Sequence, residues 1–392
     1  MMTATTPVPG PGATAEPSSV ARLSQTTAVS LARRFPLVRR RTAACGQLAE
    51  RVDGVAQAAH TLSINPARTV ERATYALNNA ALLASDCKRP ELAVDLCWRQ
   101  VEIYTAQSAP LTVTAAMAML GPVTNIARLR ALSGQTDSAI SLLTQLLRAV
   151  RTGGRTTIDG HVLRLDRVDG TMEERRALVR WMWSRLLTDG IKALALVGRW
   201  SDAARLVTTY NGLGDRLTEP RQAMVLASLL DGDLGGARRQ LEAATVGDLW
   251  EHDVASCLTV LTTTPSARAE AARAMVDAFR RGSPQEGHAA YRARHGVTVA
   301  LLARATENPH ADDVVRQVAA EAIGALDGYA AREVLRHADW GLSDQDHGRL
   351  ERIMERSGLT GGRLTGQMLT KLQNAADSAV TTLGETMASG RL

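Results

Sequence analysis

Apolar and small residues recur at helical spacing through most of the chain. Between residues 66 and 85, Ala73, Leu77, Ala80 and Ala84 fall on one side of a predicted helix. Comparable patterns follow one another as far as residue 383, and short breaks that contain glycine or proline separate them. The pattern therefore predicts an all-α fold built from a succession of helices.

One junction between predicted helices is repeated. A helix stops at a glycine, and five residues later a small alanine lies early in the next helix, where it permits close packing. Three copies and one earlier, degenerate copy lie between residues 73 and 244. They are Gly134 with Ala139, Gly198 with Ala203, Gly232 with Ala237, and the degenerate segment from Lys88 to Ala93.

The patterns divide the chain into four parts. Residues 1–19 are rich in Pro, Ala and Thr and are predicted to be a disordered tail, because they cannot bury enough apolar surface to order themselves. Residues 20–65 are predicted to be an N-terminal helical segment that is interrupted near Pro36. Residues 66–246 hold the repeats, and residues 247–392 are predicted to continue the array as a C-terminal helical region.

Residues 151–170 interrupt the repeats as an insertion. Two short β-prone runs flank Asp159 and Gly160, and Asp-Gly is a favoured hairpin turn. No strand is expected outside this insertion. Because loops can vary while a repeat array holds, the insertion either carries function or is a plain connector, and the sequence favours neither interpretation.

Composition and charge are ordinary for a soluble protein. The 46 Lys and Arg residues exceed the 40 Asp and Glu residues by six, which permits an acidic partner without requiring nucleic acid. Almost all of these cations are arginines, and with the abundant alanine this suggests a high-GC genome such as that of an actinobacterium. The chain has no apolar run long enough for a membrane span and no signal peptide, so the expected location is the cytoplasm.

The repeated junction resembles that of tetratricopeptide repeat (TPR) proteins, whose unit is two antiparallel helices. Ala203 and Ala237 are 34 residues apart, which is the period of that family. The resemblance covers residues 73–244, although the aromatic positions of the TPR motif are mostly missing. It implies a TPR-like α-solenoid, an array of helix pairs whose concave groove binds a peptide or protein partner.

Asn79 and Asn125 each lie 14 residues before the alanine of a junction. In peptide-binding members of the TPR family, asparagines at this place face the groove, where an amide can hold a peptide backbone or a terminal carboxylate. Asp189 would repel a carboxylate, so a general peptide groove is expected; alternatively, the asparagines satisfy one another inside the stack. The resemblance implies as binding residues Asn78, Asn79, Asn125, Arg128 and Arg185.

No residue set predicts a catalytic reaction, a cofactor or a metal site. Cys87 and Cys97 are ten residues apart, and Cys257 lies five residues after His252, so neither pair has the short spacing of zinc ligands. These residues and Cys45 are expected to be reduced and buried thiols.

Two histidine-containing segments have simpler interpretations than chemistry. His288, Tyr291 and His295 share one helix face, which could form an acid–base or metal patch but is interpreted as a surface stripe. A second segment matches no calcium loop and is interpreted as a helix start that Ser343 caps. Its residues are His337, Asp339, Asp344, Asp346 and His347.

Two features could indicate contact with nucleic acid or another anion. The predicted helices 343–356 and 360–372, joined through Gly358, could form a helix-turn-helix, but many helix pairs with a glycine turn look alike. Five arginines could contact phosphate or an acidic peptide, although a solvated helix face is the expected arrangement. They are Arg33, Arg34, Arg39, Arg40 and Arg41.

The expected function is that of a non-catalytic scaffold that binds a peptide or protein in its concave groove, without cofactor or metal. Residues 78–86 and 96–100 are similar to stretches of proteins from pathways that modify ribosomally made peptides of the lanthipeptide type. That resemblance implies the alternative of a maturation-complex subunit that binds a precursor peptide or assists its cyclisation, with Cys87, Cys97 and the insertion as first places to look. A TPR-like transcriptional regulator is a second alternative.

Overall fold

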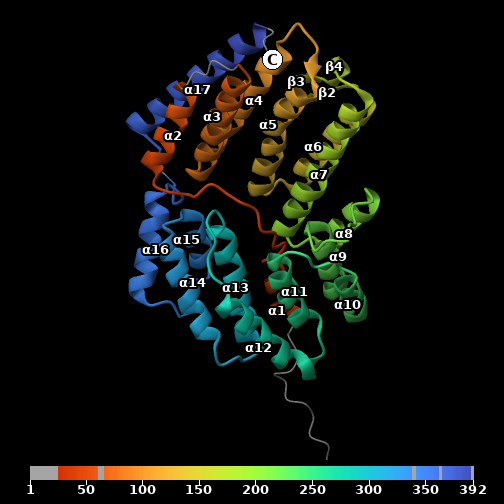
Figure 1. Ribbon diagram of the computed structural model, residues 1–392, viewed down its shortest axis with the longest axis vertical. Helices are drawn as coiled ribbons and strands as arrows, with labels where there is room; N and C mark the ends of the chain where they lie inside the picture. The colour runs from red at the N-terminus through yellow and green to blue at the C-terminus, as the bar shows by residue number, and fades with distance from the viewer. Residues whose placement is uncertain (1–24, 61–65, 338–340, 362–363, 390–392) are drawn as a thin grey trace, which may run out of the picture.

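The computed structural model of the chain describes residues 25–60, 66–337, 341–361 and 364–389. These ranges hold seventeen α-helices and four short strands, so the prediction of an all-α fold is confirmed (Figure 1). The tail predicted at residues 1–19 lies outside them.

The helices are α1 (Gln25–Ala32), α2 (Leu48–His60), α3 (Pro66–Asp86), α4 (Pro90–Thr105), α5 (Val113–Leu132), α6 (Thr136–Thr152), α7 (Met172–Leu196), α8 (Trp200–Thr209), α9 (Glu219–Leu230), α10 (Leu234–Glu242), α11 (Leu249–Thr262), α12 (Pro265–Arg281), α13 (Ala289–Ala305), α14 (Ala311–Ala325), α15 (Gly328–Leu335), α16 (Asp344–Arg356) and α17 (Gly366–Ala388). The strands are β1 (Leu111–Thr112), β2 (Arg155–Ile158), β3 (His161–Arg164) and β4 (Val168–Asp169).

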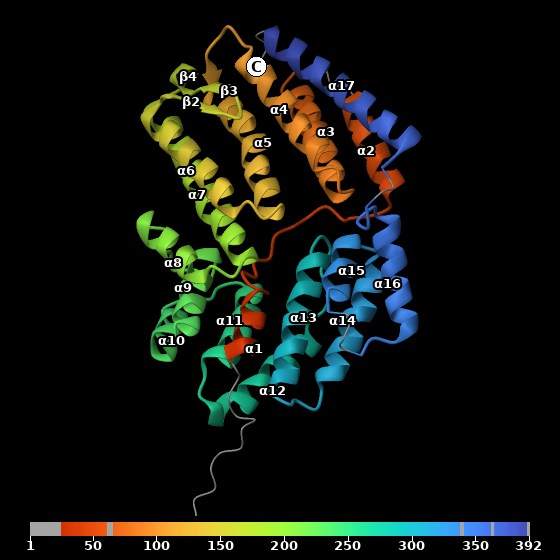
Figure 2. The ribbon, with the colours of Figure 1, turned by 180° about the vertical axis from the view of Figure 1, so that it is seen from behind.

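The helices pack in chain order around a closed circuit. Each helix from α2 to α15 packs on the next, and α17 returns to pack along α2 and α3. Figures 1 and 2 show α2 to α7 at one end of the molecule and α11 to α16 at the other, with α8 to α10 joining them. The odd-numbered helices from α3 to α15 also contact one another in turn, and we call them the inner layer.

The repeated junction has the geometry that its sequence predicts. Gly134, Gly198 and Gly232 adopt φ values of 80°, 75° and 84°, which glycine reaches without a steric cost. The four junction alanines are all buried, where a larger side chain would force the helices apart. A further junction, between α13 and α14, places Glu307 at φ 52° and has no glycine, so the sequence pattern does not reveal it.

The insertion forms the predicted hairpin. β2 and β3 pair antiparallel, and Asp159 and Gly160 form the turn with φ values of 50° and 84°. The hairpin is tied to the helices, because His161 stacks on Trp98 at 4.0 Å and Asp159 pairs with Arg130 at 2.6 Å. The expectation of no other strand is wrong: β1 pairs in parallel with β4, but a strand of two residues leaves no alternation to detect.

The N-terminal helical segment predicted at residues 20–65 has a much longer interruption than the break expected near Pro36. Residues 33–47, which we call the strap, contain no helix beyond the turn at Arg33 and Arg34, and cross between the two ends of the molecule (Figures 1 and 2). Pro36 cannot donate a helical hydrogen bond. Backbone groups of Arg34, Leu37 and Cys45 instead bond to residues of distant helices or of the turns beside them, which reduces the advantage of local helix formation.

Two further local predictions have opposite outcomes. Ser343 caps α16 as expected, since its side chain accepts from the Asp346 N–H. The alternative of a helix-turn-helix over residues 343–372 finds no support, because α17 is 23 residues long and buries one face along α2 and α3, whereas α16 packs on α14 and α15.

Arg51 on α2 joins the first and last parts of the circuit. Its guanidinium donates to the Asp86 carboxylate at 2.6 Å and to the Ser357 carbonyl at 3.2 Å. Tyr329 donates to the same Asp86 oxygen at 2.5 Å. The Arg51 and Asp86 side chains are only 13% and 8% exposed, so their charges depend on each other for neutralisation.

We predict that Arg51→Met lowers the free energy of unfolding by about 3–5 kcal/mol, because it leaves the Asp86 carboxylate buried without its cation. Urea unfolding of the single variants and of Arg51→Met/Asp86→Asn measures the coupling. The double variant is expected to be more stable than Arg51→Met alone; strictly additive losses would contradict this account.

Candidate functional site

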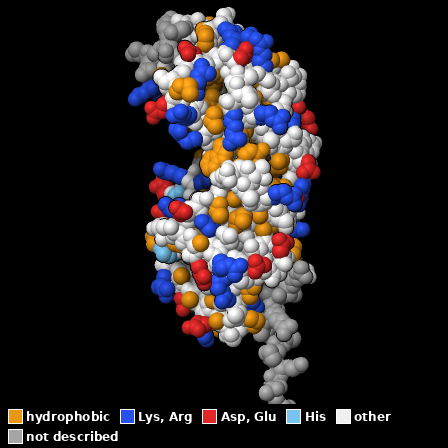
Figure 3. Space-filling model, turned by 90° about the vertical axis from the view of Figure 1, so that its right-hand side faces the viewer, with side chains coloured by type: hydrophobic (Ala, Val, Ile, Leu, Met, Phe, Trp, Pro, Cys, Tyr) orange, Lys and Arg blue, Asp and Glu red, His pale blue; other side chains and the backbone are white. Residues whose placement is uncertain are grey.

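The strap lies on the inner layer as an extended peptide would. Its backbone and side chains bond to α9, α13 and α15 and to the turns that precede them. Figure 3 shows that the surface is hollowed at mid-height between the two ends of the molecule, with Lys and Arg side chains along the hollow. The inner face of the circuit is therefore the candidate binding surface, and part of it is already occupied.

Gln222 on α9 holds the strap by its backbone. The Gln222 amide oxygen accepts from the Leu37 N–H at 2.7 Å, and its nitrogen donates to the Leu37 carbonyl at 2.7 Å. The second hydrogen of this nitrogen goes to the Leu217 carbonyl at 2.9 Å. Gln222 is completely buried, and its amide both accepts from and donates to the extended backbone of the strap.

Arg34 anchors the start of the strap in a charged cluster. It donates to the Glu333 carboxylate at 2.9 Å and to Nε2 of His337 at 3.0 Å, while Arg294 donates to the Arg34 carbonyl at 2.8 Å. Burial by itself raises the pKa of Glu333, but Arg294, Arg34 and Arg336 outweigh it and hold that pKa below its usual value. This carboxylate therefore stays ionised beside Arg34.

Cys45 fixes the other end of the strap through its backbone. Its N–H donates to the Asp327 carboxylate at 3.0 Å, and its carbonyl accepts from the Gly328 N–H at 2.8 Å and the Ser357 hydroxyl at 2.9 Å. The other Asp327 oxygen caps α15. One buried carboxylate thus serves both the strap and a helix terminus.

Of the five arginines between residues 33 and 41, Arg33, Arg40 and Arg41 are exposed, as expected of solvated side chains. The prediction of a solvated helix face fails for the group as a whole, however. Arg34 is buried, Arg39 donates to Gln285 at 2.8 Å, and Arg40 pairs with Glu219 at 2.7 Å. Three of the five arginines thus bond to side chains of α9, α15 or the segment before α13, so the group is not a simple solvated face.

The predicted asparagines lie on α3 and α5. Asn79 donates to the Tyr75 carbonyl of its own helix at 2.8 Å. Asn78 and Asn125 are partly exposed and make no hydrogen bond within the described ranges. Asn125 lies one helical turn before Arg128, so the two side chains share a face of α5.

The predicted arginines Arg128 and Arg185 both lie near Asp189. Burial raises the pKa of Asp189, and the positive charges of Lys192, Arg185, Arg40 and Arg128 oppose that shift. Arg185 lies 3.8 Å from the Asp189 carboxylate. The structure thus places two predicted arginines in one cationic cluster. The Asp189 carboxylate lies inside this cluster and is partly neutralised by it.

Sequence reasoning missed Lys192, Glu219 and Gln222. Lys192 Nζ lies 3.4 Å from the Glu219 carboxylate, which also takes Arg40. Burial lowers the pKa of Lys192, and Glu219 partly opposes the shift. The available signal was positional: Lys192 lies seven residues after Arg185, two turns along the same face of α7.

The described thiols and the second histidine segment show no metal-site or nucleophile geometry. Burial raises the pKa of Cys87 to about 11 and that of Cys97 to about 12, so both stay protonated at neutral pH. Of the second histidine segment, Asp339 lies outside the described residues, and His337 faces Arg34 instead of the helix that Ser343 begins. Within the described ranges, no three His, Cys, Asp or Glu side chains are placed to hold a metal ion.

The interpretation of His288, Tyr291 and His295 as a surface stripe is wrong for His295. This ring is 2% exposed, lies 6.0 Å from the Tyr291 ring and meets the edge of Phe279 at 5.4 Å. Gly296 allows this burial, because a Cβ there would lie 2.4 Å from Val318. Neither His295 nitrogen has a partner in the described structure, and burial lowers its pKa to about 3.

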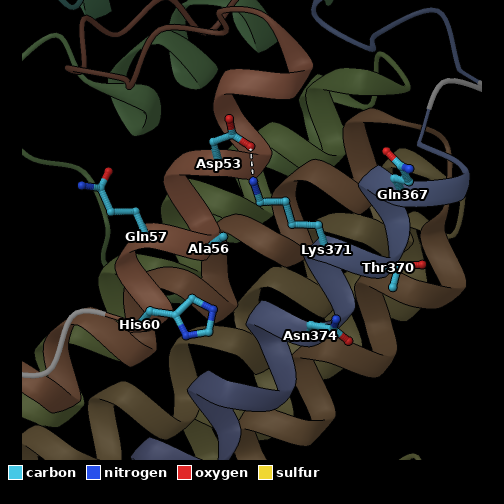
Figure 4. A pocket seen from close by; sticks show the side chains of 8 residues that line it. All are labelled: Asp53, Ala56, Gln57, His60, Gln367, Thr370, Lys371 and Asn374. Carbon is cyan, nitrogen blue, oxygen red and sulfur yellow. Dashed lines mark hydrogen bonds and ion pairs between the residues drawn. The ribbon is translucent and has the colours of Figure 1, made fainter.

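A groove between α2 and α17 has a volume of about 660 Å³ but no convergent chemistry. Asp53 and Lys371 bridge it at 2.7 Å. Figure 4 shows His60 over the groove, whereas Gln57 and Thr370 point away from each other on its two sides. The polar groups cannot all contact one ligand, so we do not place the functional site here.

Comparison of the chain with protein-family models, with curated proteins and with solved structures finds no match in any of the three. Of the helices described, none combines the length and the apolar character needed to cross a bilayer.

We predict that Gln222→Met lowers the free energy of unfolding by about 1–3 kcal/mol for each of the two Leu37 backbone groups that it orphans. Methionine keeps the length of the side chain, so the loss reports on the hydrogen bonds. Gln367→Met, at an exposed position of α17, is the matched control for urea unfolding. Equal stability of the two variants would show that Gln222 does not hold the strap.

We predict that His295 makes the protein less stable in acid. The unfolded chain takes up a proton near pH 6.5 and the folded chain only near pH 3, so stability falls by up to about 1.4 kcal/mol per pH unit as pH drops between these values. His295→Leu should remove this part of the slope in urea unfolding between pH 7 and pH 5. Exposed His252→Gln is the control, and an unchanged slope in His295→Leu would refute the assignment.

Proposed function

We propose that the protein is a non-catalytic, TPR-like helical scaffold whose inner face binds a peptide or protein segment. The observation that carries this proposal is the binding of the extended strap to the inner layer, where the Gln222 side chain bonds to both backbone groups of Leu37. Recognition through main-chain groups does not depend on the bound sequence, and it suits an extended segment. The same chemistry is available to Asn125 on α5, whose amide has no partner in the described structure.

The strap itself is a permanent part of the fold in this proposal. Phe35 and Leu37 are among the largest fully buried side chains, so removal of the strap would open the core. A partner therefore binds beside the strap, on the open faces of α3, α5 and α7. The residues proposed to contact it are Asn78, Asn79, Asn125, Arg128 and Arg185.

The alternative of a peptide-maturation subunit is compatible with the proposed scaffold, if the bound segment is a precursor peptide. Its chemical candidates were Cys87 and Cys97, and both thiols are buried and protonated at neutral pH. The insertion is held by the stacking of His161 on Trp98 and by the pairing of Asp159 with Arg130. A role in such a pathway would rest on binding the precursor peptide, not on thiol chemistry.

We predict that Asn79→Ala/Asn125→Ala loses a partner that the unchanged protein captures from lysate of its native host. Mass spectrometry of co-purified proteins and peptides is the measurement. Both positions are partly exposed, so the variant should keep its stability in urea unfolding. Asn374→Ala, in the α2–α17 groove, is the control that should retain the partner. Equal capture by all three proteins would exclude the asparagines from binding.

A further inference from the structure

The C-terminal halves of α5 and α7 form a continuous surface beside the strap. α5 and α7 pack on each other in the inner layer. Arg199, in the turn after α7, pairs at 2.6 Å with Asp137 in the first turn of α6, so the end of α7 is linked to the segment that follows α5. We call this surface the α5–α7 face and define it by Arg128, Leu132, Arg185, Lys192, Leu196 and Val197.

One band of this face is cationic. Arg128, Arg185 and Lys192 lie together with Arg40 of the strap, and all four act on Asp189. Among the ion pairs of the described residues, these cations meet two carboxylates: Asp189 lies beside Arg185, and Glu219 is shared between Arg40 and Lys192. The band therefore keeps a positive charge that an acidic partner would neutralise.

The neighbouring band is apolar. Leu132 lies one helical turn beyond Arg128, and Leu196 lies one turn beyond Lys192, so both helices present a cation followed by a leucine. Leu132, Leu196 and Val197 are 56%, 54% and 44% exposed, although large apolar side chains are usually covered. Adjacent exposed apolar side chains of this kind are typical of an interaction site.

We infer that the α5–α7 face binds an acidic amphipathic peptide segment, whose carboxylates meet the cationic band and whose apolar side chains cover the leucines. The inference rests on the proposed function and names the class of its partner. Charge complementarity selects acidic over basic segments, and the apolar band selects against segments that are only acidic.

The test uses the full-length protein and fluorescein-labelled peptides of about twelve residues, which suffice to span two helices. One peptide repeats Glu and Leu, the second replaces Glu by Lys, and the third replaces Leu by Ser. Fluorescence anisotropy should show binding of the Glu–Leu peptide, at least about tenfold weaker binding of both others, and weaker binding at about 200 mM than at about 50 mM salt. Arg128→Gln/Arg185→Gln and, separately, Leu132→Ser/Leu196→Ser should each weaken Glu–Leu binding about tenfold.

Arg180→Gln is the matched control, because Arg180 is exposed on α7 about 140° around the helix from Arg185. It should leave peptide affinity unchanged, and urea unfolding should show that all variants fold. Equal binding of the Glu–Leu and Lys–Leu peptides, or unchanged affinity in Arg128→Gln/Arg185→Gln, would overturn this inference and leave the proposed scaffold intact. Loss of the proposed function would show differently, as no peptide binding together with no partner captured from lysate.

Discussion

An extended segment makes no helical hydrogen bonds, so every buried N–H and carbonyl group of the strap needs a partner elsewhere in the chain. This constraint shapes the centre of the molecule. Gln222 serves Leu37, Arg294 serves Arg34, and Asp327 with Gly328 serves Cys45. These partners come from three separate helices of the inner layer or from the turns beside them. The helices must therefore be in place before the strap is satisfied, and the strap in turn links α9 to α13 and α15. Closure of the circuit at Arg51 depends on the same arrangement, since Arg51 lies directly after the strap and also contacts the Cys45 sulfur at 3.2 Å.

The helices could be predicted from the sequence because their information is local. Apolar spacing locates their faces, and the glycine-then-alanine junction locates their ends, as at Gly134 and Gly198. The strap could not be predicted in this way, because Gln222 lies 185 residues from Leu37 and no local pattern records that contact. The path of α17 was hidden for the same reason: its apolar face could be read, but not that α2 and α3 would cover it. His295 shows a third limit, because the small residue beside it, Gly296, decides its burial through contacts with Phe279 and Val318.

The candidate site was only partly accessible to sequence reasoning. Arg128 and Arg185 were found through spacing that resembles the TPR family, and the structure brings both near Asp189. Lys192 and Arg40 complete the cluster, but the TPR resemblance assigns no role to Lys192, and Arg40 comes from the strap. A cluster whose residues come from separate elements can be recognised only in the folded chain. The amide that holds an extended backbone is likewise present, but at Gln222 instead of Asn79, which bonds to its own helix.

The charge on the inner layer differs between its helices. This difference explains why the strap covers α9 and α15 but leaves α5 and α7 open. On α9 and α15 the inner face is acidic, and the strap brings Arg40 to Glu219 and Arg34 to Glu333. Burying those carboxylates without cations would be costly, so the arginines of the strap are required by the fold. On α5 and α7 the excess is positive, and the strap, which is itself basic, cannot neutralise it. The same segment that completes one part of the inner face therefore adds Arg40 to the cations of the other, which leaves there the positive charge that the proposed acidic partner would neutralise.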